Sequence, residues 1–207
     1  MTTWTIVVAA GSGQRFGSDK LLVDLCGTSV IERSLATARS VSDGVVLVWR
    51  DEPWTGSEVD SVVLGGEHRS DSVRAGLDRV PDDADVILVH DAARPLATRD
   101  LFEAAIDAVH NGADAATPGV PIVDTLKRVD GELILETVDR DDLRAVQTPQ
   151  AFSAAKLREA HTSAPVVTDD AAAIERIGGR AVCIPGEIRN RKLTSGEDLE
   201  IMRAWCA

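Results

Sequence analysis

A loop that combines glycines with cations follows the first apolar segment of the chain. Residues 4–10 are apolar and β-branched, the pattern of a strand buried on both faces. The loop that follows contains Gly11, Gly13, Arg15, Gly17 and Lys20. Glycines let backbone N–H groups approach a ligand closely, and Arg and Lys form charge-assisted hydrogen bonds with phosphate oxygens. The stretch therefore predicts a polyphosphate-binding loop at the carboxyl edge of a parallel sheet.

Two common phosphate-binding loops do not fit this stretch. The dinucleotide fingerprint needs a third glycine where Phe16 stands, and its acidic residue should come well before Asp51, which ends the second expected strand. The P-loop needs Gly-Lys-Ser/Thr, whereas Lys20 lies between Asp19 and Leu21. A glycine-rich turn with two solvated cations remains the alternative without function.

A second glycine-containing loop is expected at the same edge of the sheet. Residues 65–77 begin with two glycines after a strand candidate and continue into a helical pattern. Backbone groups of Gly66 and Glu67, with the hydroxyl of Ser72, could bind the edge of a nucleobase. A site whose polar groups are placed for one base leaves them unpaired with another, so such a pocket would discriminate between bases.

A carboxylate follows the next buried strand candidate. Residues 85–89 are largely apolar and lead into His90 and Asp91. A carboxylate at the end of a rigid strand is a common ligand for a divalent cation, so we expect Asp91 to hold Mg²⁺ or a similar ion. For His90 we favour a structural hydrogen bond.

Composition limits the class of protein. The 207 residues fit one α/β domain, and 34 acidic against 22 basic residues give a net charge of −12. This charge argues against nucleic-acid and anionic-membrane partners. We expect no signal peptide or membrane span. Cysteines 26, 183 and 206 match neither a metal motif nor a disulfide framework, which fits the cytoplasm.

The periodicity predicts an α/β fold: a Rossmann-like, mostly parallel twisted sheet with flanking helices. We expect strands at 4–10, 44–49, 59–64, 85–89, 113–120 and 180–184, and helices at 29–39, from about 69, 101–109, 153–161, 168–176 and after 195. Expected helix caps are Ser29 with Glu32 as its capping-box partner, Ser70 or Asp71, Thr168 to Asp170, and Ser195.

The segment at about 121–145 is different in kind. It alternates apolar and polar residues around Asp130-Gly131, a hairpin-turn dipeptide. Val123, Leu126 and Val129 are expected to face Leu133, Leu135 and Val138. Because an isolated hairpin is marginally stable, we predict a projecting β-arm that forms a homodimer with a second copy. A hairpin packed on its own domain is the alternative. The chain is thus predicted as a single domain, 1–207, with this inserted arm.

Several segments together resemble the 2-C-methyl-D-erythritol 4-phosphate cytidylyltransferase family of the nucleotidyltransferase superfamily. In chain order they are AAGSGQRFG, GGEHRSDSV, VHDAARP, DTLKR, TPQAF, VTDDAAAIE and NRKLTSGEDL, from residue 9 to residue 199. The resemblance implies a transferase of non-mevalonate isoprenoid biosynthesis. This enzyme joins CTP and methylerythritol phosphate into 4-diphosphocytidyl-2-C-methyl-D-erythritol and pyrophosphate, with a divalent cation.

The resemblance also implies roles for individual residues. Arg15 and Lys20 would hold the triphosphate, and Lys192 would approach the α-phosphate. The nucleotide would contact Ala9, Ala10, Gly11, Gly13, Gly66, Glu67 and Ser72. The polyol phosphate would contact Arg94, Thr148, Thr168 and Lys192, together with Thr125 and Arg140 from the arm of the partner subunit. No general base is required, because the attacking phosphate is already an anion. A ribitol-5-phosphate cytidylyltransferase and a non-catalytic nucleotide-binding protein remain alternatives.

Overall fold

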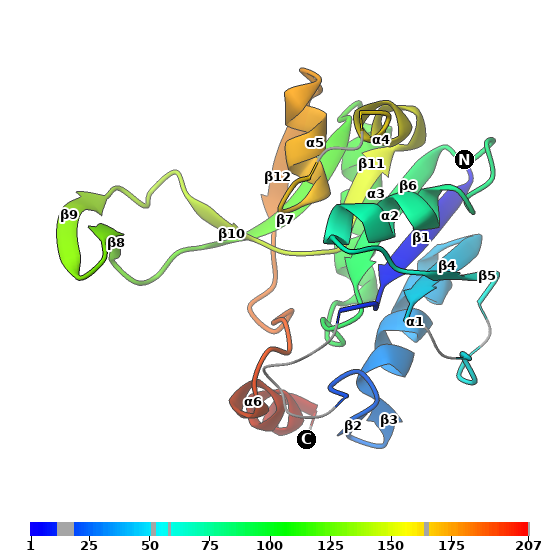
Figure 1. The fold of residues 1–207 in the computed structure, drawn as a ribbon, viewed down its shortest axis with the longest axis horizontal. Coiled ribbons are helices and arrows are strands. Elements are labelled where there is room, and N and C mark those ends of the chain that lie inside the picture. Colours follow the sequence, from blue (N-terminus) through cyan, green and yellow to red (C-terminus); the bar gives the residue numbers. More distant parts are fainter. Residues whose placement is uncertain (12–18, 51–52, 58, 164–165, 207) are drawn as a thin grey trace.

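The core of the fold is one mostly parallel sheet, as the sequence predicted. The computed structural model describes residues 1–11, 19–50, 53–57, 59–163 and 166–206. Within them, the sheet runs in the order β10 (Arg144–Val146), β7 (Ala115–Pro121), β11 (Gln150–Ser153), β6 (Val86–Asp91), β1 (Thr3–Val8), β4 (Gly44–Trp49) and β5 (Ser61–Leu64). An eighth strand, β12 (Ala181–Pro185), pairs with β7. Figure 1 shows the sheet in the centre of the molecule.

Two strands run against the others, and the sequence did not predict them. Strand β11 lies antiparallel between β6 and β7, and β10 pairs antiparallel with β7. Both belong to the segment that returns from the arm. Because β11 contacts β6, the residues just before it are carried to the end of that strand, where Asp91 lies.

Helices cover both faces of the sheet and bury two apolar clusters. On one face lie α1 (Val30–Val41), α3 (Arg99–His110) and α6 (Gly196–Cys206), and on the other α2 (Arg69–Leu77), α4 (Ala154–His161) and α5 (Asp170–Arg176). Alternate residues of each central strand join opposite clusters: Val7 joins the first and Ile6 the second. Both are fully buried, which explains why the strands read as continuous apolar runs.

The helix caps confirm some expectations and correct others. Ser29 accepts from the N–H of Glu32 at 3.3 Å, but the Glu32 carboxylate accepts from Ser57 N–H instead of completing a capping box. The cap of α2 is neither Ser70 nor Asp71.

The cap residue of α2 is His68, and Asp71 accepts from its backbone N–H at 2.9 Å. Ser70 is instead buried within the helix. The remaining expectations are confirmed: Asp169 caps α5 through Ala172 N–H, and Ser195 Oγ accepts from Asp198 N–H.

The predicted arm is a two-stranded hairpin, β8 (Leu126–Asp130) and β9 (Leu133–Val138), that projects from the body of the protein (Figure 1). A bulge between Arg128 and Val129 shifts the register, so that Val129 pairs with Ile134 and not with Leu133 or Leu135 as expected. Leu126 pairs with Val138, one of the three residues that this side of the hairpin was expected to face.

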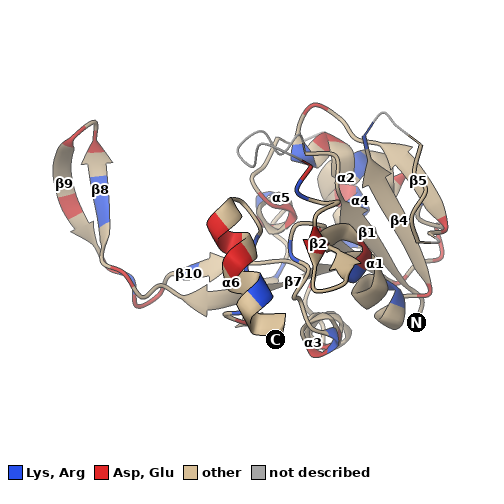
Figure 2. Ribbon diagram, turned by 90° about the horizontal axis from the view of Figure 1, so that it is seen from below, with Lys and Arg blue, Asp and Glu red and all other residues tan. Residues whose placement is uncertain are grey.

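The arm buries little of its apolar surface within one chain. Val129, Leu133 and Leu135 keep 55%, 65% and 53% of their surface exposed. Figure 2 shows basic residues on β8 beside acidic residues on β9, and Arg128 Nε lies 2.6 Å from Glu136 Oε1. The alternative of a hairpin lying on its own domain therefore does not describe this chain. The small hairpin β2 (Asp24–Leu25) and β3 (Thr28–Ser29) precedes α1.

Candidate active site

The carboxyl ends of neighbouring parallel strands bring the predicted loops together. In the register of β1 and β6, Val8 pairs with Asp91, so the first loop begins beside the candidate metal ligand. The second loop follows β5, the next strand but one from β1. An added Cβ at Gly65 would lie 2.1 Å from the Ala10 Cβ, so only glycine permits this close approach of the two loops.

A cavity of about 430 Å³ lies between these loops. Its walls include most residues predicted to bind the nucleotide or its phosphates: Ala9, Ala10, Gly11, Lys20, Gly66, Glu67, Ser72 and Lys192. Gly13 and Arg15 lie outside the described residues. The Ser72 hydroxyl accepts from Gly66 N–H at 3.1 Å, which fixes its position while its own O–H can still donate.

A second cavity, of about 150 Å³, adjoins the first. Its walls include three residues predicted to bind the second substrate, namely Arg94, Thr148 and Thr168. Arg69, Asp91 and Lys192 border both cavities. A group bound in one cavity could therefore meet a group bound in the other at these three side chains.

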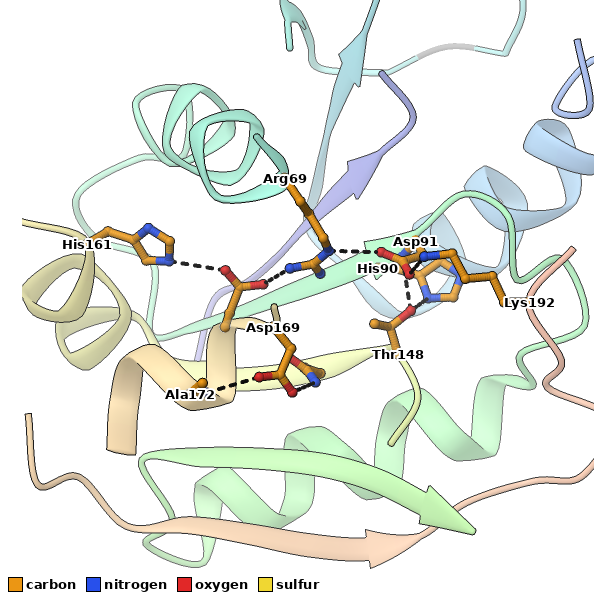
Figure 3. A network of polar contacts seen from close by, with 10 residues as sticks. Arg69, His90, Asp91, Thr148, His161, Asp169, Ala172 and Lys192 are labelled. Atoms are coloured by element: carbon orange, nitrogen blue, oxygen red, sulfur yellow. Dashed lines mark hydrogen bonds and ion pairs between the residues drawn. The ribbon is translucent and has the colours of Figure 1, made fainter. Parts of the chain in front are cut away.

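The Asp91 carboxylate lies between two cations (Figure 3). Its Oδ2 accepts from Lys192 Nζ at 2.7 Å, and its Oδ1 accepts from Arg69 Nε at 3.2 Å. Burial alone would raise the pKa of this carboxyl, but the nearby charges of Arg69 and Lys192 bring the pKa well below its ordinary value. Asp91 is therefore ionised at neutral pH.

Sequence reasoning missed the network that continues from Arg69. Its second nitrogen, Nη1, lies 2.6 Å from Asp170 Oδ2, and Asp170 Oδ1 lies 3.1 Å from His161 Nε2. Arg69 lies in the segment GGEHRSDSV, where the sequence pattern predicts no role for it, and the pattern predicts Asp170 only as part of a helix cap. The available signal was a cation three residues after the paired glycines at the sheet edge.

The expected structural role of His90 is confirmed. The ring is fully buried, and Nδ1 lies 3.2 Å from the Thr148 hydroxyl, which also accepts from Asp91 N–H at 2.9 Å. Burial lowers the pKa of His90 to about 4, so the ring is neutral in the folded protein at neutral pH. Thr148 thus joins the end of β6 to the segment before β11.

The backbone around Lys192 is held at several points. Lys20 Nζ donates to Leu193 O at 3.0 Å, and Leu193 N–H donates to Ala93 O at 2.7 Å. Arg94 Nη1 donates to Asn190 O at 2.8 Å. These bonds position Lys192 although its own side chain is 42% exposed.

The two arm residues predicted to bind substrate border neither cavity of their own chain. Thr125 is exposed, and Arg140 Nη1 donates to Val123 O near the base of the hairpin. Within one chain, the structure therefore brings together the predicted residues of the body but not those of the arm.

Among the described residues, no cluster of three or more His, Cys, Asp or Glu side chains could hold a metal ion. One carboxylate, Asp91, borders both cavities. This donor set fits Mg²⁺, which is commonly bound by one or two carboxylates together with substrate phosphates and water. Each Asp91 oxygen still has a lone pair beyond the one used by its cation.

The sheet, the glycine-containing loops at its carboxyl edge and the shared cations are those of an α/β nucleotidyltransferase. Residues 3–206 match the family model described as 2-C-methyl-D-erythritol 4-phosphate cytidylyltransferase. The chain belongs to this family.

Individual relatives agree with the family match. The protein of that name from Saccharopolyspora erythraea is 41% identical, with 100% of both chains covered, and that from Streptomyces avermitilis is 40% identical over 99% of this chain and 92% of its own. The crystal structure of the Thermus thermophilus protein of that name superposes with a TM-score of 0.86 at 30% identity, covering 99% of this chain and 98% of that one.

Proposed function

We propose that the chain transfers a cytidylyl group from CTP to 2-C-methyl-D-erythritol 4-phosphate, which yields the CDP-linked alcohol and pyrophosphate. The observation that carries this proposal is the pair of adjoining cavities with Arg69, Asp91 and Lys192 between them. Phosphoryl transfer between two substrates needs such an arrangement, because the phosphate groups of both substrates must lie next to each other and beside the same positively charged side chains. The names of the relatives give 2-C-methyl-D-erythritol 4-phosphate as the acceptor and the cytidylyl group as the group transferred, and CTP is the proposed donor of that group.

In this proposal the larger cavity binds CTP. The backbone of residues 9–11 and 66–67, with the Ser72 hydroxyl, contacts the cytidine, and Lys20 contacts the phosphates. Gly13 and Arg15 complete this set on the basis of the sequence alone. With a formal net charge of −12 on the chain, these local cations offset a field that would otherwise repel a polyanion.

The smaller cavity binds the polyol phosphate through Arg94, Thr148 and Thr168. Lys192 borders both cavities, so its ammonium group can approach the attacking phosphate and the α-phosphate of CTP together. The attacking oxygen forms a bond to the α-phosphorus while the bond to pyrophosphate breaks, and Lys20, Arg15 and Lys192 stabilise the developing charge. The attacking phosphate is an anion, so no side chain has to remove a proton.

Asp91 is the proposed ligand for Mg²⁺ or another divalent cation that accompanies the nucleotide. When bound, such an ion neutralises charge on the phosphate oxygens. In the structure, Lys192 Nζ lies 2.7 Å from Asp91 Oδ2. When a cation binds Asp91 and the substrates bind, this ammonium group would move toward the phosphates.

The proposed active form is a homodimer in which the arms exchange. The apolar residues of β8 and β9 are largely exposed within one chain, and Thr125 and Arg140 lie away from both of its cavities. A second copy would cover the apolar face and bring Thr125 and Arg140 to the substrate cavity of its neighbour.

We place the protein in the cytoplasm. Its three cysteines are free thiols, as expected in a reducing compartment. No helix in the described ranges combines the length and apolar character needed to cross a bilayer.

Pyrophosphate release tests the proposed function. The purified protein is mixed with Mg²⁺, CTP and either methylerythritol phosphate or ribitol 5-phosphate, and UTP replaces CTP in a parallel series. We expect rapid release only with CTP and methylerythritol phosphate. Preference for ribitol 5-phosphate would establish the alternative substrate, and CTP binding without release from any mixture would indicate a non-catalytic nucleotide-binding protein.

A further inference from the structure

Arg69 is shared by two carboxylates that belong to different walls of the site. Its Nε lies 3.2 Å from Asp91 Oδ1 (Figure 3). Its Nη1 lies 2.6 Å from Asp170 Oδ2. Asp91 ends β6, whereas Asp170 begins α5 directly after Thr168 and Asp169, which border the smaller cavity. Arg69 therefore connects the candidate metal ligand to the wall of the substrate cavity.

Asp170 is completely buried and borders neither cavity. Its charge is compensated by Arg69 on one oxygen and by His161 Nε2, at 3.1 Å, on the other. His161 Nδ1 is buried without a hydrogen-bond partner in the described part of the chain, so the proton belongs on Nε2, which donates to Asp170. Burial alone would raise the pKa of Asp170, but the His161 hydrogen bond and the Arg69 charge bring the pKa below its ordinary value.

The Arg69 guanidinium forms hydrogen bonds with two different carboxylates, Asp91 and Asp170. An arginine next to a single carboxylate tends to form a two-pronged pair with both oxygens. Here one nitrogen is directed to Asp170, and Asp91 receives a single hydrogen bond from Nε. Without the Asp170 charge, the guanidinium would pair with Asp91 alone and compete for the oxygen lone pairs that a cation needs.

We propose that Asp170 is a positioning residue that acts through Arg69 to keep the Asp91 carboxylate available to the divalent cation that accompanies CTP. The inference rests on the proposed function of this site. Asp170 does not touch a substrate; it determines how Arg69 shares its hydrogen bonds. Partners one step removed from a metal ligand typically change metal affinity tenfold to a hundredfold when replaced.

The test compares CTP binding by calorimetry in Mg²⁺ and in EDTA, without a second substrate. For Asp170→Asn we expect the gain in CTP affinity from Mg²⁺ to shrink at least about tenfold, while CTP affinity in EDTA stays within about twofold of the wild type. Asp60→Asn is the matched control, because Asp60 pairs with Arg39 and borders neither cavity; it should retain the wild-type gain. A role in folding alone would lower the fraction of binding-competent protein and leave the gain from Mg²⁺ unchanged.

Two further variants show whether the effect passes through Arg69. The double variant Arg69→Gln/Asp170→Asn should have the same gain from Mg²⁺ as Arg69→Gln alone, since coupled residues are not additive. Arg69→Lys keeps a charge beside the intact Asp170 carboxylate but has one nitrogen in place of two. The Asp170 charge should hold this ammonium group away from Asp91, so Arg69→Lys should keep most of the wild-type gain.

Arg69→Lys provides the result if Asp170→Asn does not fold. An unchanged gain from Mg²⁺ in folded Asp170→Asn, a gain reduced at least about tenfold in Arg69→Lys, or additive losses in the double variant would overturn the proposal. Wild-type protein that binds no CTP in either buffer would instead refute the proposed function.

Discussion

Acid should destabilise the protein through His90, and the size of the effect can be worked out from the structure. The folded state holds the His90 pKa at about 4 because the ring is buried, whereas the ordinary value is 6.5. Above pH 6.5, His90 is mostly unprotonated in both the folded and the unfolded protein. Between pH 6.5 and about pH 4, mainly the unfolded protein binds a proton at this ring, so the free energy of unfolding falls as the pH falls. From about pH 7.5 to pH 5 the expected loss is about 2 kcal/mol, at about 1.4 kcal/mol per pH unit. Below about pH 4 this contribution levels off.

The variant His90→Asn isolates this contribution. The Asn side chain can retain the hydrogen bond to Thr148 but does not titrate, so the variant should lose about 2 kcal/mol less than the wild type over the same pH interval. Urea denaturation at both pH values measures the difference. His110→Asn, at the exposed end of α3, is the control and should keep the wild-type loss. Equal losses in the wild type and His90→Asn would refute the reasoning.

Four further predictions concern the proposed reaction and the proposed dimer. Lys192→Ala should lower kcat roughly a hundredfold or more, the effect of losing one oriented donor to a developing anion, with unchanged far-UV dichroism; a near-wild-type kcat would remove Lys192 from the reaction. Ser72→Ala should reduce the preference for CTP over UTP in competition assays, and an unchanged preference would show that this hydroxyl does not select the base. Leu135→Asp should weaken the dimer roughly a hundredfold in sedimentation experiments, because it buries an unpaired carboxylate. Mixing Arg140→Ala with Lys192→Ala chains should restore part of the activity, and heterodimers without activity would contradict a shared site.

The body of the fold could be predicted because its signals are local. The central strands are buried on both faces and read as apolar runs, and glycines and charged residues follow them at one sheet edge. Ala10, Gly66 and Ser72 therefore lie around the cavity where the sequence placed them.

Two of the features that sequence reasoning missed depend on contacts between distant segments. Strand β11 forms between β6 and β7 only after the chain has returned from the arm. The pairing of Arg69 with Asp170 spans 101 residues. The bulge that moves Val129 opposite Ile134 is a local irregularity of the hairpin, and the alternation of apolar residues does not reveal it.

The fate of the α-phosphate of CTP is the most direct test of the proposed cytidylyl transfer. CTP labelled at the α-phosphorus is incubated with Mg²⁺, methylerythritol phosphate and the protein, and the products are separated. The proposed in-line attack predicts that all transferred label appears in 4-diphosphocytidyl-2-C-methyl-D-erythritol and that the released pyrophosphate is unlabelled. Label released as CMP, or no labelled alcohol in the presence of both substrates, would contradict it.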